Sequence, residues 1–200
     1  MEVSEWLIEN TPELKIDLSP RSVPCARGLQ FASRYVGDPE QDRVLDYLPD
    51  SMFHRVANPN DFLRVLVCDK WTGNSDGRQA VFLKRLGRRE YEAVFIDQGY
   101  CFNAGEWNFP DSPLRGTYVR DSVYEIVTGW QSFEPTLSKV EQFEIHSLWS
   151  IAAEIPAEWY EHDSEAITRL IETLHARRSH IRELITSFRN STRNPFPNWK

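Results

Sequence analysis

The sequence predicts an α+β fold in which strands come early and most helices come late in the chain. Two β-rich segments, 79–84 and 91–97, flank a charged turn at 85–90, which is the pattern of a hairpin. A long amphipathic pattern that begins near residue 163 closes the chain. With 200 residues, 40% of them hydrophobic, the chain is long enough for one domain with a sizeable core.

The first part of the chain gives weaker signals. Segment 5–9 fits either a strand end or a short helix, and the proline and serine residues of 17–24 predict a loop. Apolar and polar residues alternate over 28–36, which predicts a strand, and the polar segment 37–42 then predicts a turn.

A helix is expected next. Segment 58–61 offers capping side chains and an acid for a first turn, and Phe62, Val65 and Leu66 follow at helical spacing. Gly73 then allows the helix to end.

The second half is predicted to be mostly helical. An irregular aromatic loop over 100–118 precedes helices at about 120–130, 136–143 and 144–154. Asp163 and Ser164 then begin one long final helix, which Asn190 and Pro195 close. Its apolar stripe consists of Ile167, Leu170, Ile171, Leu174, Ile181, Leu184, Ile185 and Phe188.

Composition excludes several classes of protein. A net charge of −7 argues against general affinity for nucleic acid, so no nucleic-acid partner is expected. The three cysteines are isolated and form no CxxC pair, which disfavours a disulfide framework or a zinc knuckle and fits a reducing cytosol. No apolar run is long enough to span a bilayer and no signal pattern opens the chain, so a cytoplasmic location without membrane contact is predicted.

Two acids carry the functional prediction. Asp76 lies in the polar segment 69–79, and Asp97 lies in the segment 95–99, so the two are 97 − 76 = 21 residues apart. That spacing places them at opposite ends of a strand–turn–strand unit, which can fold their side chains toward one another. Paired acids in polar loops are what metal-dependent phosphoryl transfer needs.

These segments resemble the HipA-like kinases. The catalytic loop of that family reads roughly D-x-W-x-x-N-x-D, matched by Asp69, Trp71, Asn74 and Asp76, and its metal loop I-D-H/Q-G is matched by 96–99. The resemblance implies that Asp76 is the catalytic-loop acid, aided by Asn74 and Arg78. It also implies that Asp97, with help from Gln79, binds Mg²⁺ and the ATP that it carries. The acceptor would be a hydroxyl of a protein or a small molecule.

The resemblance covers 28–135 and the end of the chain at 194–199. It implies a kinase-like fold in which 1–36 is a remnant of the N-lobe and hinge strand and 37–200 is a helical C-lobe. Two positions depart from the family. Val81 stands where a second metal-binding Asn is expected, and the Gly-rich loop, strand lysine and helix glutamate of an N-lobe are missing, since Lys15 lies in no convincing strand.

Other interpretations remain open for each residue. Asp76 and Asp97 could simply cap backbone amides, and Asp69 could orient the loop or bond the helix end. Asn74 could order its own backbone, and Arg78 could hold Asp76 or a phosphate, or form a surface salt bridge. Trp71 is expected in the core, and packing is favoured for the aromatics of 100–109. A non-catalytic remnant that binds a protein partner through the aromatic loop and a helical face is the competing function.

Overall fold

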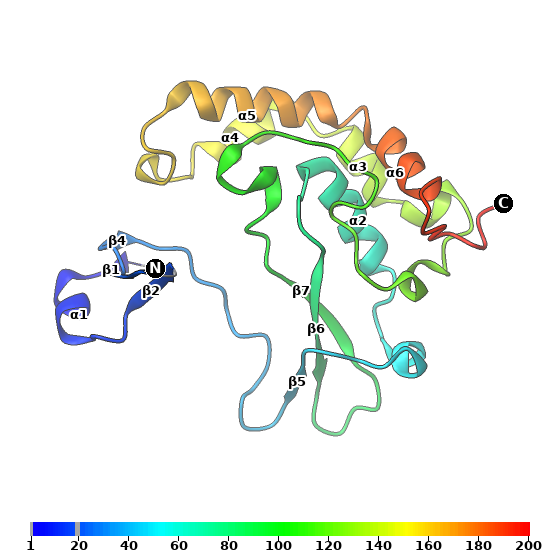
Figure 1. Cartoon of the computed structure of the whole chain (residues 1–200), viewed down its shortest axis with the longest axis horizontal. Helices are drawn as coiled ribbons and strands as arrows, with labels where there is room; N and C mark the ends of the chain where they lie inside the picture. Colours follow the sequence, from blue (N-terminus) through cyan, green and yellow to red (C-terminus); the bar gives the residue numbers. More distant parts are fainter. Residues whose placement is uncertain (1, 19–20) are drawn as a thin grey trace. The chain divides into compact units, whose positions relative to one another are not determined.

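The computed structural model describes residues 2–18 and 21–200, which form two compact units that divide between Tyr35 and Val36 (Figure 1). Small antiparallel sheets lie early in the chain and helices dominate the C-terminal part, so the predicted α+β class is confirmed. Among the described residues no helix has both the length and the apolar character needed to cross a membrane.

The first unit holds one short helix and two antiparallel ribbons. The helix is α1 (Glu5–Asn10), and the ribbons pair β1 (Glu2–Val3) with β4 (Gly28–Leu29) and β2 (Lys15–Leu18) with β3 (Arg21–Pro24). Ser4 caps α1 by accepting a hydrogen bond from the Leu7 amide. None of the side chains described in this unit is buried.

Three predictions for this unit were wrong. Segment 17–24 was expected to be a loop, but its described residues lie in strands, and Pro24 is tolerated because it ends β3. Lys15 likewise begins a strand. The strand expected over 28–36 stops after Leu29, because only the two residues of β1 pair with it.

The second unit contains the predicted hairpin. Strands β6 (Gln79–Lys84) and β7 (Glu92–Ile96) pair antiparallel with Gln79 opposite Ile96, and β5 (Arg43–Leu45) pairs with the far end of β6. Gly87 turns the hairpin with a left-handed φ of 75°. Ala80 and Phe82 face the main hydrophobic cluster, so one face of the sheet is buried.

Helix α2 (Asp61–Thr72) packs on that buried face and confirms the predicted helix. Its start is tied to the sheet, since the Asn58 side chain donates to the Ala93 carbonyl and accepts from the Ala93 amide. Gly73 ends the helix with φ 60°, and its amide donates to the Asp69 carbonyl. The helix therefore delivers Asp69 and the following loop to one end of the hairpin.

The remaining elements are short 3₁₀ turns and four helices. The turns are η1 (Asp50–Arg55), η2 (Cys101–Glu106), η3 (Asp121–Tyr124), η4 (Trp130–Phe133) and η5 (Ala157–Tyr160); the helices are α3 (Thr136–Glu141), α4 (Ile145–Ala152), α5 (Ser164–Arg177) and α6 (Ile181–Arg189). The single helix expected over 120–130 was wrong. Two 3₁₀ turns replace it, separated by a stretch that ends in the extended backbone of Gly129.

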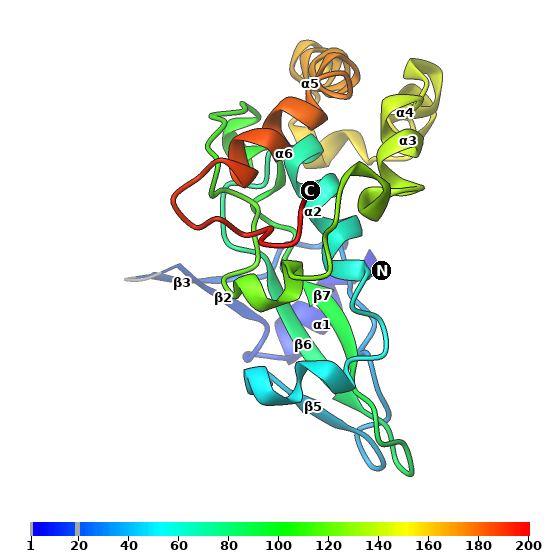
Figure 2. The same ribbon diagram turned by 90° about the vertical axis from the view of Figure 1, so that its right-hand side faces the viewer.

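The single long final helix was also wrong, because its apolar stripe serves two separate cores. Leu170, Ile171 and Leu174 of α5 pack in a cluster with α4, whereas Ile181 and Ile185 of α6 pack in the main cluster with α2. The helix is interrupted between Arg177 and Ile181, so the two halves of the stripe pack in different clusters. Figure 2 shows α5 and α6 as separate segments at an angle to each other.

Candidate functional site

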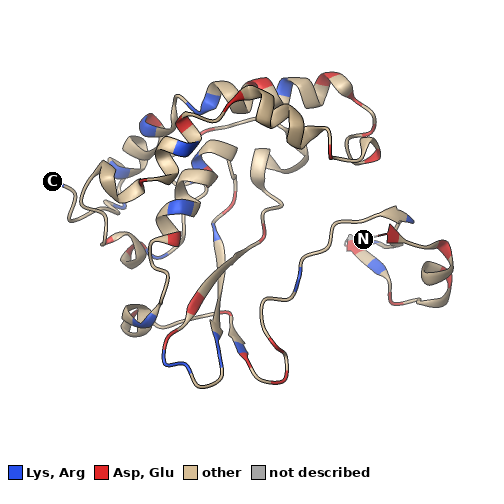
Figure 3. Cartoon of the chain, turned by 180° about the vertical axis from the view of Figure 1, so that it is seen from behind, with Lys and Arg blue, Asp and Glu red and all other residues tan. Residues whose placement is uncertain are grey.

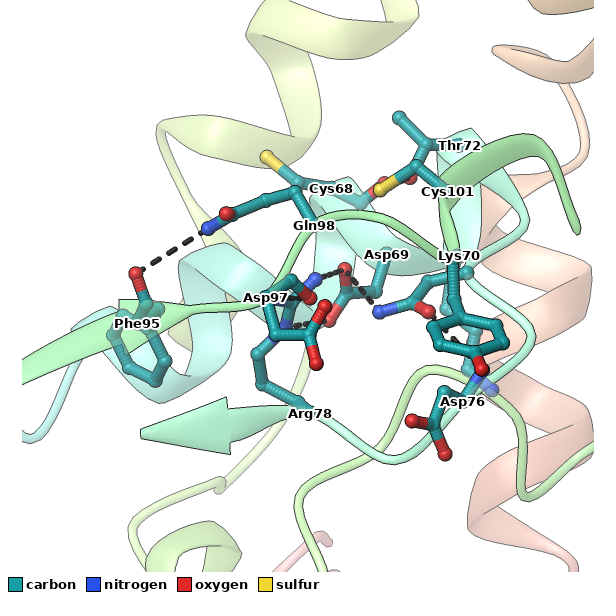
Figure 4. Close-up of polar contacts among 12 residues, drawn as sticks. Cys68, Asp69, Lys70, Thr72, Asp76, Arg78, Phe95, Asp97, Gln98 and Cys101 are labelled. Carbon is teal, nitrogen blue, oxygen red and sulfur yellow. Dashed lines mark hydrogen bonds and ion pairs between the residues drawn. The ribbon is translucent and has the colours of Figure 1, made fainter. Parts of the chain in front are cut away.

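A buried ion pair lies at the base of the candidate site. Arg78, just before β6, donates from Nε to Oδ2 of Asp69 at 2.8 Å and from Nη2 to Oδ1, and both side chains are 2% exposed. Figure 4 shows Asp69 and Arg78 beside Asp97, with Asp76 on a separate stretch of chain. The surface salt bridge considered for Arg78 was therefore wrong, and so was its direct contact with Asp76, because the guanidinium is turned into the protein.

Burial and pairing act against each other in this ion pair. Burial raises the pKa of Asp69, against the hydrogen bonds from Arg78 and Asn74 that lower it. Burial alone would lower the pKa of Arg78, but the hydrogen bonds and charge of Asp69, with a smaller effect of Cys101, raise it above its usual value. Arg78 is thus a fixed positive charge inside the protein.

Arg78 also holds the loop that carries Asp97. Its Nη1 donates to the Ile96 carbonyl at 2.9 Å and to the Asp97 carbonyl at 3.2 Å. Asp97 has a left-handed φ of 58°, a conformation that costs a side chain-bearing residue about 1 kcal/mol. One guanidinium therefore joins the end of α2, the loop before β6 and the strained end of β7.

Asn74 orders the backbone around Asp76. Its side chain is 2% exposed, donates to Oδ1 of Asp69 at 3.2 Å and accepts from the Asp76 amide at 3.1 Å. The prediction that Asn74 orders its own loop is confirmed, and Asp69 orients that loop through Asn74 and Arg78.

Asp76 is exposed and held from two sides. Its Oδ1 accepts from the Gly77 amide at 2.7 Å, and its carbonyl accepts from the Gly116 amide at 3.0 Å. Gly116 has φ 63°, and a Cβ there would lie 2.9 Å from the Asp69 Cβ, so this position requires glycine. No described residue donates to the second carboxylate oxygen of Asp76.

The segments that carry the two acids adjoin one another. The Ser75 amide donates to the Tyr100 carbonyl at 3.1 Å, so the residue before Asp76 touches the loop that follows Asp97. On the other side of Asp76, Arg78 reaches the Asp97 carbonyl. Both acids are exposed at the ends of these segments (Figure 4).

Gln79 and Asp97, the two residues expected from the sequence to bind Mg²⁺, are in contact with each other. The Gln79 amide donates from Nε2 to Oδ2 of Asp97 at 2.8 Å, which follows from the pairing of Gln79 with Ile96 in the sheet. The amide oxygen of Gln79 and Oδ1 of Asp97 accept no hydrogen bond from the described residues. These are ligand types that Mg²⁺ takes in proteins, usually with only one or two carboxylates. The described residues contain no cluster of three His, Cys, Asp or Glu side chains suited to a metal.

A second set of buried charges fixes the loop between Asp97 and Gly116. Arg177 donates to both carboxylate oxygens of Asp111 at 2.8 Å and to the Lys70 and Trp71 carbonyls. Lys70 donates to the Pro113 and Arg115 carbonyls at 2.8 and 2.7 Å. Burial lowers the pKa of Lys70 to about 8.

Neither of these cations was identified from the sequence. A basic residue on a helix usually lies on a solvated face, which is what the sequence predicts for Arg177, but the residue is 8% exposed. A helical pattern shows which face a residue occupies, but it contains no sign that a carboxylate and two carbonyls from other segments meet there.

The aromatic residues near the site are mostly structural, as expected. Trp71 packs beside Phe143 and donates from its indole to the Leu174 carbonyl at 2.8 Å. Phe102, Trp107 and Phe109 pack against the smaller cluster, and Tyr100 remains 47% exposed. An open pocket of about 340 Å³ adjoins the site instead, lined in part by Gln79, Ile96, Tyr47, Tyr118 and Arg120.

No protein-family model, curated protein sequence or solved structure matches this chain. Any functional assignment therefore depends on the side chains of the site and on the two motifs that contain Asp76 and Asp97.

Proposed function

We propose that this chain is a HipA-like kinase domain that transfers a phosphoryl group from magnesium-bound ATP to a hydroxyl of a protein or a small molecule. In this proposal residues 37–200 are a kinase-like C-lobe, and residues 1–36 are the end of an N-lobe with its hinge strand.

The observation that carries the proposal is the four-way contact of Arg78. It joins Asp69 to the Ile96 and Asp97 carbonyls. The loops that carry the exposed carboxylates of Asp76 and Asp97 are therefore both anchored on one buried ion pair. Phosphoryl transfer depends mostly on positioning and on electrostatic stabilisation, and fixed acids on adjoining loops supply the first of these.

Each residue has a separate role in the proposed reaction. Asp97 and the amide oxygen of Gln79 would hold Mg²⁺, which, when bound, neutralises charge on the phosphates. Asp76 would accept the proton of the acceptor hydroxyl at the carboxylate oxygen that Gly77 leaves free. Asn74 and Arg78 are buried and would act as positioning residues for these two acids.

Calorimetric titration of magnesium–ATP into the full chain tests this function. The wild-type chain should bind the nucleotide only when Mg²⁺ is present, and Asp97→Asn should weaken binding by about 10-fold or more, as loss of a metal ligand does. Asp17→Asn, an exposed acid of β2, is the matched control and should bind as the wild type does. Equal affinity of the Asp97→Asn chain would remove Asp97 from the site.

The alternative is a non-catalytic kinase-like domain that binds a protein partner. Tyr100 is the exposed member of the aromatic loop and favours this function, whereas the inward packing of Phe102, Trp107 and Phe109 leaves that loop little further apolar surface. A wild-type chain that binds no nucleotide in the same titration would favour the alternative.

A further inference from the structure

We propose that Cys68 and Cys101 are a redox-modification site, at which a hydroperoxide converts the two thiols into a reversible disulfide. The bond would link α2 to the loop that follows Asp97. Sequence spacing gave no indication of this pair, since the two residues are 101 − 68 = 33 positions apart.

Thr72 shows that the two cysteines are neighbours. Cys68 and Thr72 lie one turn apart on the same face of α2. The Thr72 hydroxyl is 2.9 Å from the Cys68 carbonyl oxygen and 3.5 Å from the Cys101 sulfur. Figure 4 shows the Cys68 and Cys101 side chains on the same side of the helix, beside Thr72.

The loop holds Cys101 in place against the helix. Its amide donates to the Gln98 carbonyl at 3.0 Å, and the neighbouring Tyr100 carbonyl accepts from Ser75. Both thiols are free and half-buried, so a small oxidant can reach them. Because α2 and the loop hold the two cysteines near each other, a disulfide between them is favoured over pairing with a thiol of another molecule.

The surroundings give the two thiols different roles. The Cys101 sulfur lies 3.5 Å from the Thr72 hydroxyl and beside the Arg78 guanidinium. Burial raises the pKa of Cys68, and the charge of Asp69 adds to the rise. Cys101 is therefore assigned as the residue that attacks the peroxide, and Cys68 as the thiol that resolves the product.

The chemistry balances in two steps. The Cys101 thiolate attacks one peroxide oxygen, so an S–O bond forms, the O–O bond breaks, and the leaving oxygen departs as water or an alcohol after protonation. The Cys68 sulfur then attacks the Cys101 sulfenic acid, so an S–S bond forms, the S–O bond breaks and a second water leaves with the Cys68 proton. The peroxide is reduced by two electrons, and a dithiol such as dithiothreitol reverses the change.

Disulfide formation would pull the start of η2 toward α2. Asp97 lies four residues before Cys101 in the same loop. Tyr100, which lies between the two, accepts a hydrogen bond from the Ser75 amide through its carbonyl. Oxidation should therefore disturb the loops of the candidate site and weaken magnesium–ATP binding. This last consequence rests on the proposed function, whereas the formation of the disulfide does not.

Peptide mass spectrometry of the full chain tests the proposal. After brief treatment with hydrogen peroxide and alkylation of the remaining thiols, digestion should yield a cross-linked peptide pair containing Cys68 and Cys101, lacking two hydrogens and lost on reduction. Cys25→Ser, the matched control in the first unit, should give the same cross-link. Cys68→Ser should instead leave Cys101 as a sulfenic acid that dimedone traps.

Two results would overturn the inference. One is a Cys101 that oxidises to sulfinic acid, or does not react, while Cys68 stays a free thiol in the wild-type chain. The other is a cross-link in which Cys25 replaces either residue. If the cross-link forms but the oxidised chain binds magnesium–ATP with unchanged affinity, the effect on the site is refuted and the modification stands. Absence of nucleotide binding in both redox states would count against the proposed function alone.

Discussion

Arg78 and Asp69 form a buried, two-point ion pair whose guanidinium still has a nitrogen left to bond the Ile96 and Asp97 carbonyls. The pair lies 78 − 69 = 9 residues apart in sequence, across the end of α2 and the loop before β6. Both motifs that carry the proposed chemistry are therefore anchored by a contact that no solvent reaches. Loss of this contact would affect the fold and the site together.

Arg78→Met should destabilise the chain by about 3–5 kcal/mol, because it leaves the Asp69 carboxylate buried without its partner. Urea unfolding followed by circular dichroism measures the change. Arg64→Met, which breaks an exposed pair with Asp61, should cost at most about 1 kcal/mol. The double variant Asp69→Leu with Arg78→Met should recover much of the loss, and a double variant no more stable than Arg78→Met would contradict the assigned cause.

Gly116→Ala should cost about 1–3 kcal/mol, since φ is 63° and the new Cβ would lie 2.9 Å from the Asp69 Cβ and 3.2 Å from the Asn74 carbonyl oxygen. Gly105→Ala is the matched control, because its Cβ would meet nothing within 4 Å. Thermal unfolding of both variants measures the difference. Equal melting temperatures would show that the loop around Asp76 is not tightly constrained.

Local patterns predicted the parts of the fold whose signals are local. The hairpin of β6 and β7 and the helix α2 were predicted because β-rich composition, the helical spacing of apolar residues and Gly73 each act within a few positions. The break between α5 and α6 was not predicted, because it results from two cores that the same apolar stripe must reach. Strands β2 and β3 of the first unit were missed, since the formation of a strand depends on its partner.

The candidate site also contains features that have a local sequence signal and features that depend on long-range packing. The neighbouring positions of Gln79 and Asp97 follow from the hairpin register, in which Gln79 pairs with Ile96. The pairing of Arg78 with Asp69 depends on how the chain after α2 turns back before β6. The burial of Lys70 and the contact of Cys101 with Thr72 depend on how the irregular loop 100–118 folds back on α2. Loops of this length have no periodic signal from which such contacts could be predicted.

Tyr124→Phe should cost about 1–3 kcal/mol, because the phenol oxygen accepts a hydrogen bond from the Tyr118 amide at 2.8 Å inside the main cluster. Burial raises the pKa of Tyr124, as expected for a phenol surrounded by apolar groups. Tyr35→Phe, at a residue 63% exposed, should change stability little. Chemical denaturation compares the two variants, and similar losses would exclude a specific role for the buried bond.

The charge of Lys70 should make stability depend on pH in the alkaline range. Burial lowers its pKa to about 8, against the charges of Asp69 and Asp111 that raise it, and the unfolded value is near 10.5. Between these values the unfolded chain binds more protons than the folded chain, so the contribution of Lys70 to stability rises with pH, by up to about 3 kcal/mol.

Lys70→Met removes this pH dependence but leaves the titration of Cys68 and Tyr124 unchanged, so the difference in unfolding free energy between wild type and variant isolates Lys70. The difference in unfolding free energy, measured from pH 7.5 to about 10, should increase with pH; a constant difference would mean that Lys70 titrates normally. Figure 3 shows acidic and basic residues interspersed along the helices, strands and loops of the chain. Lys70 is buried, and its two carbonyl partners explain why a cation lies there at all.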